Sequence, residues 1–144
     1  MLVAVTAVVL LATMVIRSVA IALVVRFVTW SLRVGYAGRS FWKNVPVTTG
    51  VMAILMAALL TQVAVWAVAC GALRDFGTAF YHSPVNFSTL GYGDIVMAPR
   101  WRLLGPLEAA NGVLMFGLSA SAMFAVTNRL IESRLKRQHH ESRP

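Results

Sequence analysis

The sequence predicts an all-α membrane protein with three transmembrane helices and one re-entrant helix. Hydrophobic residues make up 58% of the 144 residues and charged residues only 12%, a balance far from that of a soluble domain. The apolar residues fall into three long runs, each long enough to cross about 30 Å of hydrocarbon. The stretch between the second and third runs is too short, and too polar at its centre, to be another crossing. These observations together indicate lipid as the solvent for most of the chain.

The three runs define the expected order of the elements. We expect the first span at about Leu2–Val25, interrupted only by Arg17, the second at about Val47–Leu73, and the third at about Leu103–Asn128. These spans divide the chain into an N-terminal helix with a basic interfacial loop, a central domain and a basic tail, at residues 1–44, 45–128 and 129–144.

Basic residues gather beside the apolar runs and predict the orientation of the chain. The loop after the first span carries four of them, including Arg39, and the tail carries five, including Arg143. The stretch from Arg74 to Arg102 has three, set against two acids, one of which is Asp75. The positive-inside rule therefore places the N-terminus outside and the C-terminus in the cytoplasm. Topology and contact with anionic lipid explain the net charge of +8 better than a nucleic-acid partner does.

The stretch from Phe76 to Arg102 must enter the membrane and return on the same side. Its first part, Phe76–Phe87, is rich in aromatic residues and is a candidate helix. Irregular backbone at membrane depth is tolerated only where protein covers it or where it lines a water-filled cavity. A re-entrant segment of this kind therefore indicates a conduction path.

The centre of that stretch reads Ser88-Thr89-Leu90-Gly91-Tyr92-Gly93-Asp94. This motif resembles the filter of the two-transmembrane-pore potassium channel family, here with one extra N-terminal span, and the resemblance extends over about Val47–Asn128. It implies passive conduction of K⁺ by a bacterial inner (plasma) membrane protein. In such a filter the carbonyl groups of Thr89, Leu90, Gly91 and Tyr92, with the Thr89 hydroxyl, replace the hydration shell of K⁺.

The filter imposes a backbone requirement and implies an assembly. Successive carbonyl groups can point at one axis only if alternate residues adopt positive φ, which Gly91 and Gly93 do without a Cβ clash. Asp94 is expected to anchor the outer end of the strand. A ring of carbonyl groups needs four strands and each chain provides one, so we expect a homotetramer with a fourfold-symmetric pore. No organic cofactor, no enzymatic activity and no nucleic-acid partner are expected; the partners are K⁺ and membrane lipid.

Several residues around the filter depart from the family pattern. His82 replaces an aromatic residue and is expected close to the Tyr92 hydroxyl, while Val85 stands where some members carry an acid. Pro84 lies inside the candidate pore helix and is expected to kink it. These departures leave open the alternative of a poorly selective or non-conducting, channel-like membrane subunit.

The third span resembles a pore-lining inner helix. If Gly112 and Phe116 face the axis, Ala120, Phe124 and Asn128 are expected on roughly the same stripe, with Phe124 as a hydrophobic gate. Two alternatives remain open. Gly112 and its neighbour Gly117 could serve close helix packing rather than bending, and Phe124 could pack against the second span.

Two charged residues lie inside predicted spans. Arg17 is interpreted as a snorkelling or helix-pairing residue rather than a voltage sensor, because a sensor needs several regularly spaced charges. Glu108 could share a face with Asn111 behind the filter and support it, or it could pair with Arg102 or Arg100.

Overall fold

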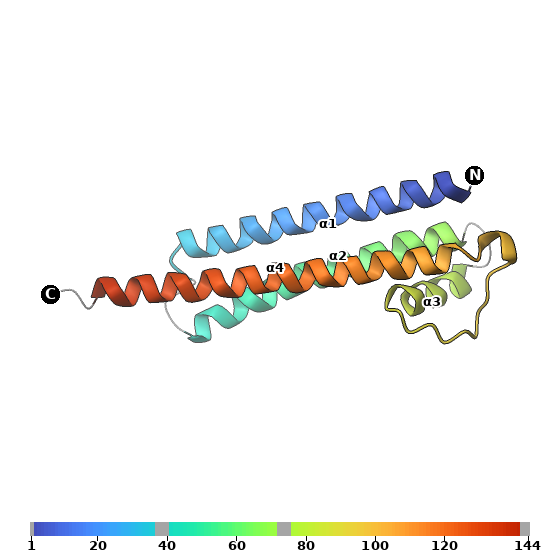
Figure 1. The fold of residues 1–144 in the computed structure, drawn as a ribbon. Helices are drawn as coiled ribbons and strands as arrows, with labels where there is room; N and C mark the ends of the chain where they lie inside the picture. The colour runs from blue at the N-terminus through green and yellow to red at the C-terminus, as the bar shows by residue number, and fades with distance from the viewer. Residues whose placement is uncertain (1, 37–40, 72–75, 142–144) are drawn as a thin grey trace. The chain divides into compact units, whose positions relative to one another are not determined.

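The computed structural model describes residues 2–36, 41–71 and 76–141, and over these residues the chain is helical without strands (Figure 1). The elements are α1 (Leu2–Arg33), α2 (Phe41–Gly71), α3 (Phe76–Phe87), the short 3₁₀ helix η1 (Pro99–Trp101) and α4 (Leu104–Glu141). Three helices contain stretches long and apolar enough to cross a membrane: Ala4–Arg33, Trp42–Cys70 and Leu104–Leu135. The all-α fold class with three candidate spans is therefore confirmed.

The predicted re-entrant helix matches α3 at both ends, whereas the long helices extend beyond the predicted spans. Helix α1 continues past Val25 because Val28 is buried, and α4 continues past Asn128 because Leu130 is buried. Hydropathy ends a span at the first polar residues, but packing keeps the backbone helical beyond that point. The continuous helix at Pro84 shows that this residue does not interrupt α3.

Some sequence predictions concern residues outside the described ranges. They are the end of the second span at Leu73 and four members of the charge count, namely Arg39, Arg74, Asp75 and Arg143.

The contacts divide the chain into two compact units, and each long helix contributes to both. The first unit comprises Met1–Ser18 and Ala58–Gly117, and the second comprises Val19–Ala57 and Leu118–Pro144. The core of the second unit is a cluster of buried aliphatic residues from α1, α2 and α4, here called the apolar cluster: Val24, Val28, Val47, Val51, Leu55, Val126 and Leu130. Gly50 allows a close contact beside this cluster, because a Cβ there would lie 2.8 Å from Cε1 of Phe27.

The first unit combines an apolar core with buried polar side chains. Its apolar residues include Trp66, Phe87 and Met115. Buried polar side chains of α1, α2 and α4 form a second feature, here called the polar network: Thr13, Arg17, Gln62 and Asn111.

The polar network joins three helices through side-chain hydrogen bonds. Gln62 Nε2 donates to the Thr13 carbonyl at 3.0 Å, and Arg17 Nη2 donates to Gln62 Oε1 at 3.3 Å. Asn111 Nδ2 donates to Thr13 Oγ1 at 3.2 Å. Arg17 is 2% exposed, so of the two roles predicted for it the structure shows helix pairing and not snorkelling.

Candidate functional site

The loop that follows α3 bonds back to the last turn of that helix. The Ser88 N–H donates to the Pro84 carbonyl at 3.0 Å, and the Thr89 N–H donates to the Asn86 carbonyl at 2.8 Å. The Gly91 N–H donates to the Val85 carbonyl at 3.2 Å. Carbonyl groups at the end of a helix lack intrahelical partners, and here the loop supplies them. The start of the filter motif is therefore fixed to the end of α3.

Positive φ alternates along the motif. The φ angles are 63° at Thr89, 57° at Gly91 and 76° at Gly93. The expectation for the two glycines is confirmed, and Thr89 was not foreseen. A Cβ on Gly91 would meet no atom within 4 Å, and one on Gly93 would meet only the Gly91 carbonyl oxygen, at 4.0 Å. Glycine is therefore favoured at Gly91 and Gly93 by the backbone conformation and not by lack of space.

The motif is open to its surroundings in the single chain. Leu90 is 60% exposed and Tyr92 is 67% exposed, and Asp94 is exposed beside them. The Ile95 N–H donates to Asp94 Oδ1 at 3.1 Å. The Tyr81 hydroxyl also hydrogen-bonds to the Asp94 carboxylate. Asp94 is thus connected to α3 through Tyr81, a residue that the sequence analysis missed although it is an aromatic donor on the predicted pore helix.

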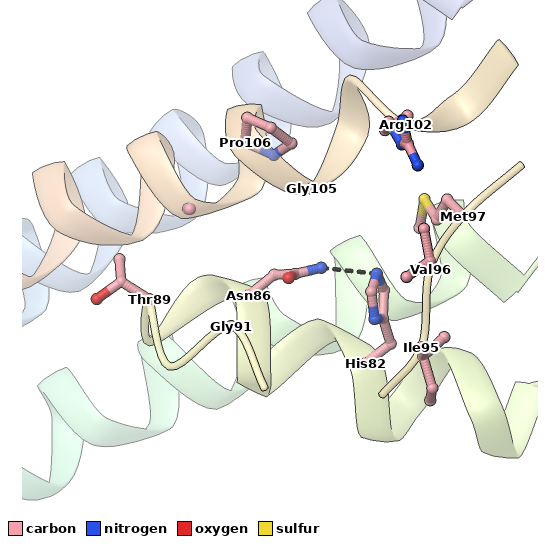
Figure 2. A pocket seen from close by; sticks show the side chains of 11 residues that line it. His82, Asn86, Thr89, Gly91, Ile95, Val96, Met97, Arg102, Gly105 and Pro106 are labelled. Atoms are coloured by element: carbon pink, nitrogen blue, oxygen red, sulfur yellow. Dashed lines mark hydrogen bonds between the residues drawn. The ribbon is translucent and has the colours of Figure 1, made fainter. Parts of the chain in front are cut away.

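A pocket of about 330 Å³ lies between α3, the loop after the motif and the start of α4 (Figure 2). His82 and Asn86, one turn apart on α3, point toward each other at one wall of this pocket, with His82 Nε2 2.7 Å from Asn86 Nδ2. An amide nitrogen only donates, so His82 Nε2 accepts, and a neutral ring carries its proton on Nδ1. A doubly protonated ring could not accept this bond. Arg102 lines the same pocket and is exposed, whereas His82 is 9% exposed.

Glu108 of α4 contacts α3 through Ser83. It is fully buried, and its Oε1 is hydrogen-bonded to the Ser83 hydroxyl. The same hydroxyl lies 3.0 Å from the Val63 carbonyl of α2. The Ser83 hydroxyl therefore contacts both Glu108 of α4 and the backbone of α2. Of the two alternatives for Glu108, this geometry supports a position behind the pore helix, and the sequence offered no signal for Ser83 as its partner.

Gly112 allows the close approach of α4 to the end of α3. A Cβ there would lie 1.9 Å from the Phe87 carbonyl oxygen, a distance that no side chain can occupy. The rings of Phe87 and Phe116 pack edge to face, with centroids 6.0 Å apart. No atom lies within 4 Å of a Cβ built on Gly117. The packing alternative is therefore what the structure shows at Gly112, and not at Gly117.

The five residues predicted to lie on roughly one stripe of α4 differ in their exposure in the single chain. Gly112 is buried, whereas Phe116, Ala120, Phe124 and Asn128 are exposed. A step of four residues turns a helix by about 400°, so the direction drifts by about 40° at each step and by about 160° from Gly112 to Asn128. Phe124 is 69% exposed in the single chain, and the alternative of packing against the second span receives no support.

Comparison with known proteins identifies the part of the chain that contains this site. A family model described as "Ion channel" matches residues 47–129, which is more than half of the 144 residues and includes α3, the filter motif and most of α4. Comparisons with curated proteins and with solved structures gave no significant match. The three candidate spans and the matched domain, which is one of ion transport, make the molecule an integral membrane protein. The chain is a member of the ion channel family.

Proposed function

We propose that the chain is the pore-forming subunit of a K⁺-selective channel that conducts passively as a homotetramer. The observation that carries the proposal is the alternation of positive φ at Thr89, Gly91 and Gly93, in an exposed segment that follows a short helix between two candidate spans. Four such strands around one axis provide stacked rings of carbonyl and hydroxyl oxygens, the ligands that replace the hydration shell of K⁺. In this assembly the exposed Leu90 and Tyr92 contact neighbouring subunits.

Specific roles follow for the residues around the filter. Thr89, Leu90, Gly91 and Tyr92 coordinate K⁺, and Gly93 and Asp94 complete the strand. His82, Val85 and Glu108 support it: Val85 through its bond from Gly91, Glu108 through Ser83, and His82 by reaching the Tyr92 hydroxyl of a neighbouring subunit. The N-terminus faces outward in a bacterial inner membrane, and no organic cofactor takes part.

The flux of K⁺ into liposomes that contain purified protein, compared with the flux of Na⁺, tests this function. We expect a strong preference for K⁺ in the wild type and its loss in Gly91→Ala, because alanine is strained at φ 57°. Gly117→Ala serves as a matched control, since its Cβ meets nothing in the chain. Equal K⁺ and Na⁺ fluxes in the wild type would indicate a poorly selective pore, and no flux from an assembled protein would indicate a non-conducting subunit.

We place the gate on the part of α4 from Phe116 to Asn128. Phe116, Ala120, Phe124 and Asn128 are exposed and lie on a gently drifting path along the helix, whereas Gly112 packs against Phe87. Four Phe124 rings around the axis would form a hydrophobic constriction that closes by dewetting. We expect Phe124→Ser to raise the resting K⁺ flux without altering the preference over Na⁺. Wild-type flux from an assembled Phe124→Ser protein would contradict the gate.

A further inference from the structure

A groove of about 690 Å³ lies in the second unit, between the first turns of α2 and the late turns of α4. It belongs to neither the filter motif nor the pocket at His82. Its residues recur at helical spacing, so each helix presents one face to it: Asn44, Val45, Thr48 and Thr49 from α2, and Thr127, Leu130, Ile131, Arg134 and Leu135 from α4.

The groove is amphipathic. Leu130 forms part of the buried apolar cluster at its base, while Ile131 and Leu135, each 52% exposed, extend an apolar strip along α4. The polar lining consists of an asparagine, three threonines and Arg134. The structure thus places an apolar strip and a cationic, hydroxyl-rich wall in one groove.

The groove lies at the ends of two candidate spans. One of these spans begins at Trp42 and the other ends at Leu135. Trp42 is 79% exposed and is followed by the exposed Lys43, the combination that is typical of a membrane–water interface. The groove is therefore at the depth of lipid headgroups, with its apolar strip continuing toward the hydrocarbon.

The charges around the groove favour an anion. Among the residues of the second unit whose side chains are described, five are basic (Arg26, Arg33, Lys43, Arg129 and Arg134) and one, Glu132, is acidic. The N–H groups in the first turn of α2, where Asn44 lies, lack intrahelical acceptors and carry partial positive charge. A second copy of this chain would bring the same excess of positive charge, which disfavours it as the occupant.

We propose that this groove binds one anionic phospholipid of the surrounding leaflet. Arg134 pairs with the phosphate group, the hydroxyl groups of Thr48 and Thr49 donate to its remaining oxygens, and an acyl chain lies along Ile131 and Leu135. A zwitterionic phospholipid fits the same groove but lacks the net negative charge that the basic surroundings attract.

Binding of phosphatidylglycerol and phosphatidylcholine with identical acyl chains, measured by native mass spectrometry on the purified full-length protein, tests the proposal without any measurement of ion flux. We expect the wild type to bind phosphatidylglycerol more tightly. Arg134→Gln should lose roughly fivefold in that affinity, the factor that one basic residue contributes near an anionic membrane surface. Ile131→Trp, which fills the apolar strip, should weaken binding of both lipids.

Arg129→Gln is the matched control, because it removes the same charge from the same helix. Arg129 lines a different pocket, with Glu132, and points about 140° away from Arg134 on an ideal helix. The proposal is overturned if Arg129→Gln weakens phosphatidylglycerol binding as much as Arg134→Gln, or if the wild type shows no preference between the lipids. Displacement of the lipid by inorganic phosphate at similar concentration would also overturn it, since the site would then bind a free anion. A thermal unfolding curve for each variant confirms that it is folded.

Discussion

Helix α1 packs in the two units through different kinds of contact. In the first unit Thr13 and Arg17 belong to the polar network, whereas in the second unit Val24 and Val28 belong to the apolar cluster. Lipid is as apolar as valine, so burial of aliphatic side chains between helices gains little from the hydrophobic effect in a membrane, and van der Waals packing remains. Hydrogen bonds between helices contribute about 0.6–2 kcal/mol each in membranes and exist only in one register.

The difference has a consequence for the part of the chain that precedes the matched ion channel domain. Helix α1 lies before residue 47, where the family match begins. A cluster dominated by valine tolerates small shifts of one helix along another, but the bond from Asn111 to Thr13 does not. We infer that the polar network sets the register of α1. The apolar cluster fills the space around the part of α1 that lies in the second unit.

The largest expected effect comes from a comparison of one glycine in each unit. An added methyl group would meet a different kind of neighbour at each of them. Gly112→Ala would place a methyl group against the Phe87 carbonyl oxygen of the backbone, whereas Gly50→Ala would meet the ring of Phe27. A ring can turn and a helix backbone cannot, so we expect Gly112→Ala to abolish the folded state and Gly50→Ala to cost about 1–3 kcal/mol. Thermal unfolding in detergent, followed by circular dichroism, measures both.

Gly117→Ala controls for the loss of glycine flexibility in α4, since it introduces the same methyl group without a neighbour. Wild-type stability of Gly112→Ala would mean that α4 does not pack this closely against α3.

A smaller effect tests the polar network against the apolar cluster directly. Gln62→Leu removes one acceptor of Arg17 and the donor to the Thr13 carbonyl, and we expect a cost of about 1–3 kcal/mol from buried polar groups that lose a partner. Val51→Ala, at a fully buried position of the apolar cluster, should cost about 1 kcal/mol through lost packing. The same unfolding assay applies.

The double variant Arg17→Leu with Gln62→Leu should be more stable than Gln62→Leu alone, because the buried charge is removed together with its partner. Arg17→Leu alone is measured as well. If the loss of stability in the double variant equals the sum of the losses in Arg17→Leu and Gln62→Leu, the two side chains do not act as a pair.

The features that could be predicted from the sequence are those in which the type of residue allows few environments or few backbone conformations. Hydropathy predicted three helical spans because a helix satisfies its own backbone hydrogen bonds in lipid and each apolar run is long enough to cross as a helix. The glycines of the filter motif predicted positive φ at Gly91 and Gly93. Thr89 could not be predicted in the same way, because a β-branched residue is unfavourable at positive φ; at this position the conformation accompanies the hydrogen bond from its N–H to Asn86.

The sequence could not predict which side chains of different helices contact each other. A pattern places Arg17, Asn111 and Glu108 inside spans but does not say which residue on another helix faces each of them. Gln62 and Ser83 are ordinary polar residues until packing brings them to Arg17 and Glu108. The stripe on α4 stays a prediction: in the single chain Gly112 is buried and the other four residues are exposed.

By itself the sequence determined the three candidate spans, the short helix Phe76–Phe87 and the two glycines with positive φ, because solvation by lipid and backbone sterics act on each residue locally. Only the tertiary structure decided that α1 and α4 continue as helices beyond the predicted ends at Val25 and Asn128, that Gly112 packs against Phe87, and that Arg17 pairs with Gln62. Those outcomes depend on which faces of different helices meet. The free energy of such a contact depends on two residues that are far apart in the chain, so neither residue predicts it alone.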